Sequence, residues 1–124
     1  MRRFSRACLA LLVLVSVGVT SGRGAHADEP RLIAIAAKRF EFSPKEIHVK
    51  VGETVTLRLT SGDVTHGLFS KPLHIDALIE PATSTDVTFT VDSAGIYTTI
   101  CDHFCGAGHG GMKMTIVVEP AGQP

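Results

Sequence analysis

The residues with the clearest chemical potential lie in one short stretch, residues 101–112, with the sequence CDHFCGAGHGGM. It offers the thiols of Cys101 and Cys105, the imidazole of His109 and the thioether of Met112. Thiolate and thioether ligands favour copper or iron–sulfur chemistry and imidazole suits copper and zinc, whereas magnesium and calcium prefer oxygen ligands. The glycines between them allow tight turns, so a short loop can direct several side chains to one point. The stretch predicts a soft-metal site.

The spacing of these ligands differs from that of a zinc finger, which pairs two cysteines with a second ligand pair a dozen or more residues away. The pattern here is Cys-x3-Cys-x3-His-x2-Met, and one further histidine, His66, lies 35 positions before Cys101 (101 − 66). One cysteine, two histidines and a weak axial methionine make a blue-copper site. The second cysteine predicts more: a binuclear centre in which two thiolates bridge two copper ions. A mononuclear copper site is the alternative.

Three other uses of these residues stay open at this point. Cys101 and Cys105 can form a disulfide in an oxidising compartment. Cys105 and His109 can act as a nucleophile and its base, although such a pair needs a third, orienting group. The two cysteines and two histidines also satisfy the ligand count of a tetrahedral zinc site, but Met112 then has no role.

Residues 101–112 resemble the binuclear copper (CuA) loop of cytochrome c oxidase subunit II and of nitrous-oxide reductase. The resemblance extends to residues 63–67 (DVTHG) and 115–119 (TIVVE). It implies the following ligand set: the bridging thiolates of Cys101 and Cys105, the imidazoles of His66 and His109, the thioether of Met112 and the backbone carbonyl of His103.

The remaining histidine side chains are expected to have lesser roles. His103 stands where the relatives carry another residue type, but a carbonyl ligand does not depend on its side chain. His48 alternates outward on a predicted strand and is expected at the surface. His74 follows His66 on a connecting segment and is expected at the surface or beside the site.

The N-terminal segment predicts export. Three arginines within the first six residues precede an apolar run, residues 7–19, which is shorter than the ~20 residues of a membrane-spanning helix. The small residues at positions 25–27 fit cleavage by signal peptidase. We predict that residues 1–27 are a secretory signal peptide, with an uncleaved anchor as the alternative. Residues 28–124 then form one copper domain in the periplasm or an equivalent extracytoplasmic space, with no membrane span.

The charge of the exported domain constrains its partners. Of 12 basic and 12 acidic residues, four arginines lie before position 28, which leaves 8 bases against 12 acids, a net charge of −4. An acidic domain whose sequence shows no basic run is not expected to bind nucleic acid or anionic membranes. Its net charge fits a positively charged partner.

The rest of the domain is predicted to be β-structure. Alternation of apolar and polar residues predicts strands at 47–51, 54–60 and 87–91. Residues 32–36, 96–100 and 113–119 are expected to form further strands. Residues 40–44 are expected to be a link because Pro44 breaks regular structure. Short strands with this punctuation predict an antiparallel sandwich. The resemblance narrows it to an all-β Greek-key cupredoxin β-sandwich whose last two strands are joined by the metal loop, with His66 at the same end.

The predicted site indicates outer-sphere electron transfer rather than catalysis, because a complete ligand set leaves no open position for a substrate. We expect a monomeric electron carrier, or at most the electron-entry part of a cytochrome c oxidase-like complex. Its partner would be a c-type cytochrome, a terminal reductase or a terminal oxidase. The alternative is a copper chaperone or storage protein that delivers Cu(I), with a copper-delivery protein as its partner.

Overall fold

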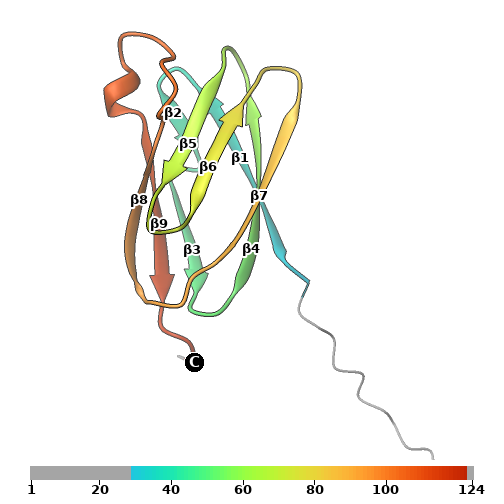
Figure 1. Ribbon diagram of the computed structural model, residues 1–124, viewed down its shortest axis with the longest axis vertical. Coiled ribbons are helices and arrows are strands. Elements are labelled where there is room, and N and C mark those ends of the chain that lie inside the picture. The colour runs from blue at the N-terminus through green and yellow to red at the C-terminus, as the bar shows by residue number, and fades with distance from the viewer. Residues whose placement is uncertain (1–28, 123–124) are drawn as a thin grey trace, which may run out of the picture.

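The computed structural model describes residues 29–122, so the predicted signal peptide lies outside the described residues. In this part of the chain nine strands form two sheets that pack face to face (Figure 1). The four-stranded sheet has the order β2-β1-β4-β7, made of β1 (Arg31–Lys38), β2 (Glu41–Ser43), β4 (Thr54–Ser61) and β7 (Ser84–Thr90). The five-stranded sheet has the order β3-β9-β8-β5-β6, made of β3 (Glu46–Lys50), β9 (Lys113–Glu119), β8 (Gly95–Ile100), β5 (His66–Ser70) and β6 (Ile75–Ile79).

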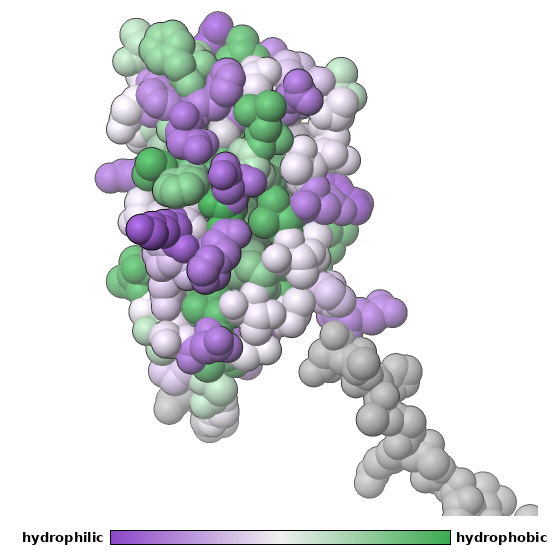
Figure 2. All heavy atoms as spheres, in the orientation of Figure 1, coloured by the Kyte–Doolittle hydropathy of each residue, from purple (hydrophilic) through white to green (hydrophobic). Residues whose placement is uncertain are grey.

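The core lies between the two sheets and follows from the alternation in the sequence. In β4 the side chains of Val55, Leu57 and Leu59 are fully buried, while the residues between them face outward. β3 and β9 show the same two-residue period from the opposite sheet. Burying one such aliphatic side chain contributes ~1.5–3 kcal/mol. Hydrophobic and hydrophilic residues are interspersed over the outer face in view (Figure 2). The predicted all-β sandwich is confirmed.

The strand directions correct the expectation of a purely antiparallel sandwich. β1 pairs with β4 in parallel, and β3 pairs with β9 in parallel, while the other pairings are antiparallel. The parallel pairs arise because the chain changes sheets between the partners, as β3 does between β2 and β4. This crossing ties the N-terminal half of the chain into both layers.

Three short features of the fold were not predicted: a strand, a hairpin and a 3-10 turn. Residues 41–43, inside the expected link, form β2, because Phe42 is fully buried and the segment pairs with the end of β1. The hairpin of β5 and β6 was also missed, since β5 is buried at nearly every position and therefore shows no alternation. The third is a single 3-10 turn, η1 (His109–Gly111). Within residues 29–122 no helix is long and apolar enough to cross a membrane.

One end of the sandwich gathers the predicted metal-binding segments. The loop of residues 101–112 joins β8 to β9, as expected, and carries η1 at the end of the molecule drawn at the top of Figure 1. His66 is the first residue of β5 and begins that strand at the same end. The turn between β1 and β2, residues 39–40, also reaches this end and contacts the loop.

Candidate metal centre

The structure brings together all five side chains that were predicted to bind a metal. Ligand atoms of His66, Cys101 and Cys105 all lie within 4.8 Å of one another. The two Sγ atoms are 3.8 Å apart, and Sδ of Met112 is 3.8 Å from Sγ of Cys105. Nδ1 of His109 lies 4.0 Å from the same sulfur. These residues are positioned by the loop between β8 and β9 and by the start of β5, which lie at the same end of the sandwich.

The site is shielded from solvent. His66 is 0% exposed, Met112 1%, Cys101 3% and Cys105 4%, while His109 is half-buried. Met112 lies directly before β9, whose inward residues belong to the core, so its thioether is held on the inner side of the site. A cluster of sulfur and imidazole in such a dry place suits a soft metal ion.

His66 is oriented as a metal-binding histidine. Its Nε2 lies 2.7 Å from Oδ1 of Asp63, so Nε2 carries the proton and donates to the carboxylate. Its Nδ1 is buried and has no hydrogen-bond partner among the described residues. A buried nitrogen without a partner is costly, and metal-binding histidines usually donate their other N–H to a carboxylate or carbonyl. The lone pair of Nδ1 therefore fits a metal ion in the site.

Asp63 remains ionised beside this ring. Partial burial raises the pKa of its carboxyl group, but three hydrogen bonds lower that pKa by more: those from the Arg39 amide, the His66 ring and the Val64 amide. The net result is a pKa well below the usual 3.8. A stable carboxylate at this place keeps the His66 ring in one tautomer and one orientation.

The two cysteines are free thiols in the structure. Burial raises the pKa of the Cys105 thiol, and the hydrogen bond and charge of the adjacent Cys101 raise it further, against a smaller opposing effect of Arg39. The metal-free Cys105 thus stays protonated at neutral pH, and metal binding at its sulfur releases a proton.

The alternative of a catalytic cysteine gains no support from this geometry. His109, the nearest candidate base, is 4.0 Å from the Cys105 sulfur. The carboxylate that could orient a base is Asp63, which contacts His66. Within residues 29–122, no carboxylate forms a hydrogen bond with His109, so the third group of a nucleophilic triad is missing there.

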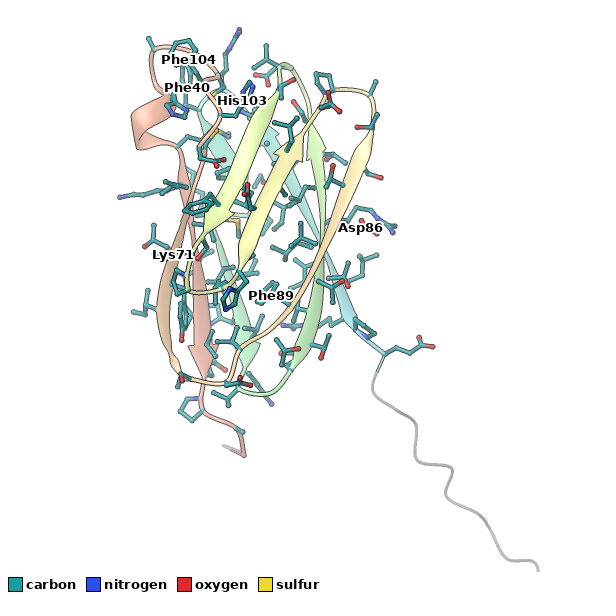
Figure 3. The ribbon with its side chains drawn as sticks, viewed as in Figure 1. Phe40, Lys71, Asp86, Phe89, His103 and Phe104 are labelled. Carbon is teal, nitrogen blue, oxygen red and sulfur yellow. The ribbon has the colours of Figure 1, made fainter. Side chains whose placement is uncertain are left out.

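The start of the loop lies close against β5. The Gly67 N–H points at Sγ of Cys101 from 3.5 Å, and the carbonyl oxygen of His103 lies 3.2 Å from that sulfur. A Cβ atom on Gly67 would be 2.1 Å from Oδ1 of Asp102, a side-chain end that can move, and 3.0 Å from the backbone nitrogen of His103, so the loop packs tightly against β5 at this glycine. The side chain of His103 is exposed at the loop end of the molecule, near Phe104 (Figure 3). Ligation by the His103 carbonyl stays a prediction.

The turn between β1 and β2 braces the same loop from the other side. The backbone N–H of Arg39 donates to Oδ2 of Asp63 at 2.7 Å, and its Nε donates to the carbonyl oxygen of Cys105 at 2.8 Å. One residue thus supports the partner of His66 and the backbone of a predicted thiolate ligand. The ring of Phe40 packs on Gly106 and Gly108, where Cβ atoms would lie 2.9 and 2.5 Å from it.

Sequence reasoning missed these supporting residues. Asp63 has a local signal, since it lies three positions before His66 within a segment that resembles the copper domains. Arg39 and Phe40 lie more than 60 positions before the loop that they contact, and no motif marks them.

Two further histidines lie away from the centre. His74 is in the turn between β5 and β6, at the opposite end of that hairpin from His66, so the structure does not place it beside the site. His48 is exposed, as predicted, and its ring contacts Glu119 at 3.0 Å and Glu46 at 2.8 Å. These carboxylates, Glu119 foremost, raise the pKa of His48.

The family follows from a comparison with known proteins. A family model described as a cupredoxin-like domain matches residues 8–118. The chain belongs to this family. As a cupredoxin it uses the sandwich described above, with its candidate ligands gathered at one end.

Relatives of this cupredoxin include an oxidase subunit and a reductase. Cytochrome c oxidase subunit 2 of Thermus thermophilus is 33% identical over 87 residues, which are 70% of this chain and 64% of that protein. Nitrous-oxide reductase of Cupriavidus necator is 33% identical over 91 residues, 70% of this chain but 14% of the reductase. The periplasmic domain of subunit II of cytochrome oxidase (CoxB) of Bradyrhizobium japonicum has a TM-score of 0.68 at 17% identity, over 73% of this chain and 85% of that one. The last likeness concerns the fold. The cupredoxin thus spans less than two thirds of either curated relative.

Proposed function

We propose that this cupredoxin is an extracytoplasmic electron-transfer protein with a binuclear, CuA-type copper centre. The observation that carries the proposal is the pair of buried Sγ atoms, 3.8 Å apart, beside His66. Nδ1 of this histidine is buried and has no hydrogen-bond partner among the described residues. A mononuclear site would leave one of these two inward-facing thiols without a role.

Two copper ions would be held by the thiolates of Cys101 and Cys105, the imidazoles of His66 and His109, the thioether of Met112 and the backbone carbonyl of His103. A copper pair held in this way supplies reversible one-electron storage. With each of these donors occupied, the site has no position for a substrate, which favours a carrier over an enzyme. Met112, which a structural zinc site would not use, lies with its sulfur turned toward Cys105.

The chain contributes rigidity to this chemistry. Asp63 fixes the His66 ring, Arg39 holds both Asp63 and the Cys105 carbonyl, and Phe40 packs against the loop. A site whose side chains are already packed in place changes little between oxidation states. A small change of geometry keeps the reorganisation energy of electron transfer low. A protein that delivers Cu(I) needs a more open site, so the buried donors favour the carrier.

The place and partners of the carrier follow from its relatives and its N-terminal segment. We propose that residues 1–27 direct export, that residues 28–124 act in the periplasm, and that the partner is a c-type cytochrome or a terminal oxidase or reductase. The relatives are named as an oxidase subunit and a reductase, and the solved structure is named as a periplasmic domain.

Copper titration of the reduced, metal-free protein tests this function. We expect two copper ions per chain, a purple product and reversible one-electron reduction, and we expect Cys101→Ser and Cys105→Ser to lose the purple colour. A blue product with one copper would leave a mononuclear cupredoxin in its place. Binding of only colourless, readily exchanged Cu(I) would instead indicate copper delivery.

A further inference from the structure

A basic groove adjoins the candidate metal centre. It lies between the turn that joins β1 to β2 and the start of β9, and its volume is about 540 Å³. Four of its lining residues are basic, Lys38, Arg39, Lys45 and Lys113, and one, Glu41, is acidic. Gly111 also lines the groove and lies next to Met112 in the chain, so whatever fills the groove comes close to the proposed copper ligands.

The positive charge of the groove is not neutralised internally. Nζ of Lys38 lies 3.2 Å from one Glu41 oxygen, and Nζ of Lys45 lies 3.5 Å from the other. One carboxylate is therefore shared by two ammonium groups, and the groove keeps a surplus of three positive charges (4 − 1). The side chains of Lys38 and Lys45 are 63% and 74% exposed, so both remain available to a partner.

The rest of the described surface has the opposite sign. Residues 29–122 contain 8 basic and 11 acidic residues. Without the groove, 4 bases (8 − 4) stand against 10 acids (11 − 1), a net charge of −6. Such a separation of charge orients a molecule as it approaches a charged partner. The acidic net charge of residues 29–122 thus conceals a basic surface at the end where electrons would leave.

Apart from Glu41, two acidic residues near this end, Asp63 and Asp102, have other contacts. Asp63 is engaged by the Arg39 amide and by His66, and Asp102 lies against Gly67 of β5. Neither residue lines the groove.

We propose that the groove is the docking surface for an acidic protein partner whose Asp and Glu side chains enter it. The purpose of this docking, electron exchange with the neighbouring centre, rests on the function proposed above. The negative net charge of the domain alone would predict a positively charged partner, whereas the groove predicts a negatively charged one. An anionic membrane attracts clusters of basic side chains, whereas this groove is concave and holds Glu41 among its four basic residues, which fits carboxylates that project from a protein surface. The half-exposed ring of Phe40 adds an apolar contact inside the same groove.

Binding of a fluorescein-labelled polyglutamate peptide tests this proposal. The peptide is titrated into the copper-free and the copper-loaded full chain at low ionic strength, where surface charges act most strongly, and binding is read by fluorescence anisotropy. The groove variant is K45E/K113E. The matched control is K50E/K71E, which changes the net charge equally at exposed lysines outside the groove. In Figure 3, Lys71 lies well away from Phe40 and His103.

We expect the groove variant to weaken peptide binding about tenfold and the control to change it less than about twofold. Equal losses in both variants would show that net charge alone governs binding and would overturn the proposal. Preferential binding of phosphatidylglycerol vesicles over the peptide, lost in the groove variant, would also overturn it by assigning the groove to a membrane. The copper-free titration does not depend on the metal. A failure of copper loading therefore contradicts the proposed function, while the copper-free titration still tests the groove.

Discussion

Replacing Gly108 by alanine should destabilise the fold through one contact, the ring of Phe40. An ideal Cβ at position 108 would lie 2.5 Å from Cγ of that ring, 0.9 Å closer than an ordinary 3.4 Å contact. The backbone is not the obstacle, because Gly108 has φ −88°, which alanine adopts readily. Either the ring or the loop must therefore move.

The size of the effect follows from what must move. Overpacking of a well-packed site costs about 1–3 kcal/mol, and the Phe40 ring, which is 40% exposed, can relieve part of the clash by turning outward. We expect a loss of about 2 kcal/mol in the free energy of unfolding. Gly110→Ala is the matched control, since its Cβ would have no neighbour within 4 Å. This control should be neutral or stabilising by up to about 1 kcal/mol.

Urea unfolding of the reduced, copper-free variants measures both effects. The double variant Phe40→Ala/Gly108→Ala completes a mutant cycle. Without the ring, the added methyl group at position 108 should cost little. If Gly108→Ala is as stable as Gly110→Ala, or if its cost persists in the absence of the ring, Phe40 does not brace the loop and the reasoning is refuted.

Three further outcomes are expected. Asp63→Asn should lower the unfolding free energy at pH 7 by about 1 kcal/mol. Because the folded-state pKa of Asp63 is depressed, its contribution to stability is complete above about pH 4 and is lost as pH falls. The unfolding free energy of the variant, measured in urea, should therefore fall less in acid than that of the unchanged protein. An equal fall in both proteins would contradict this. Met112→Leu should change the stability by less than about 1.5 kcal/mol yet alter the copper absorption spectrum, and an unchanged spectrum would exclude the thioether ligand. His103→Ala should retain the full copper count, whereas His109→Ala should reduce it; equal retention would remove His109 from the site.

The clustering of the candidate side chains in the loop could be predicted because these residues are close together in the chain. Cys101, Cys105, His109 and Met112 share one loop, so only His66 had to be brought in from elsewhere. The ligand count of a copper site and the resemblance both indicated that histidine. The strands with regular alternation, such as β4 and β9, were predicted because only one face of each is buried.

The features that were not predicted depend on tertiary contacts that produce no recognisable pattern in the sequence. β5 is buried on both faces except at Phe69, which removes the two-residue period. β2 is three residues long and is a strand because it pairs with β1. The contact of Arg39 with Cys105 spans 66 positions and joins a side chain to a backbone carbonyl. Any residue type at position 105 has that carbonyl, so the sequence alone does not predict that Arg39 donates a hydrogen bond to it.

Electron paramagnetic resonance of the oxidised, copper-loaded protein tests the central claim most directly. Two copper ions that share one unpaired electron through the sulfurs of Cys101 and Cys105 should give hyperfine structure from two equivalent copper nuclei, at two coppers per chain. Hyperfine structure from a single copper nucleus, with one copper per chain, would contradict the binuclear centre.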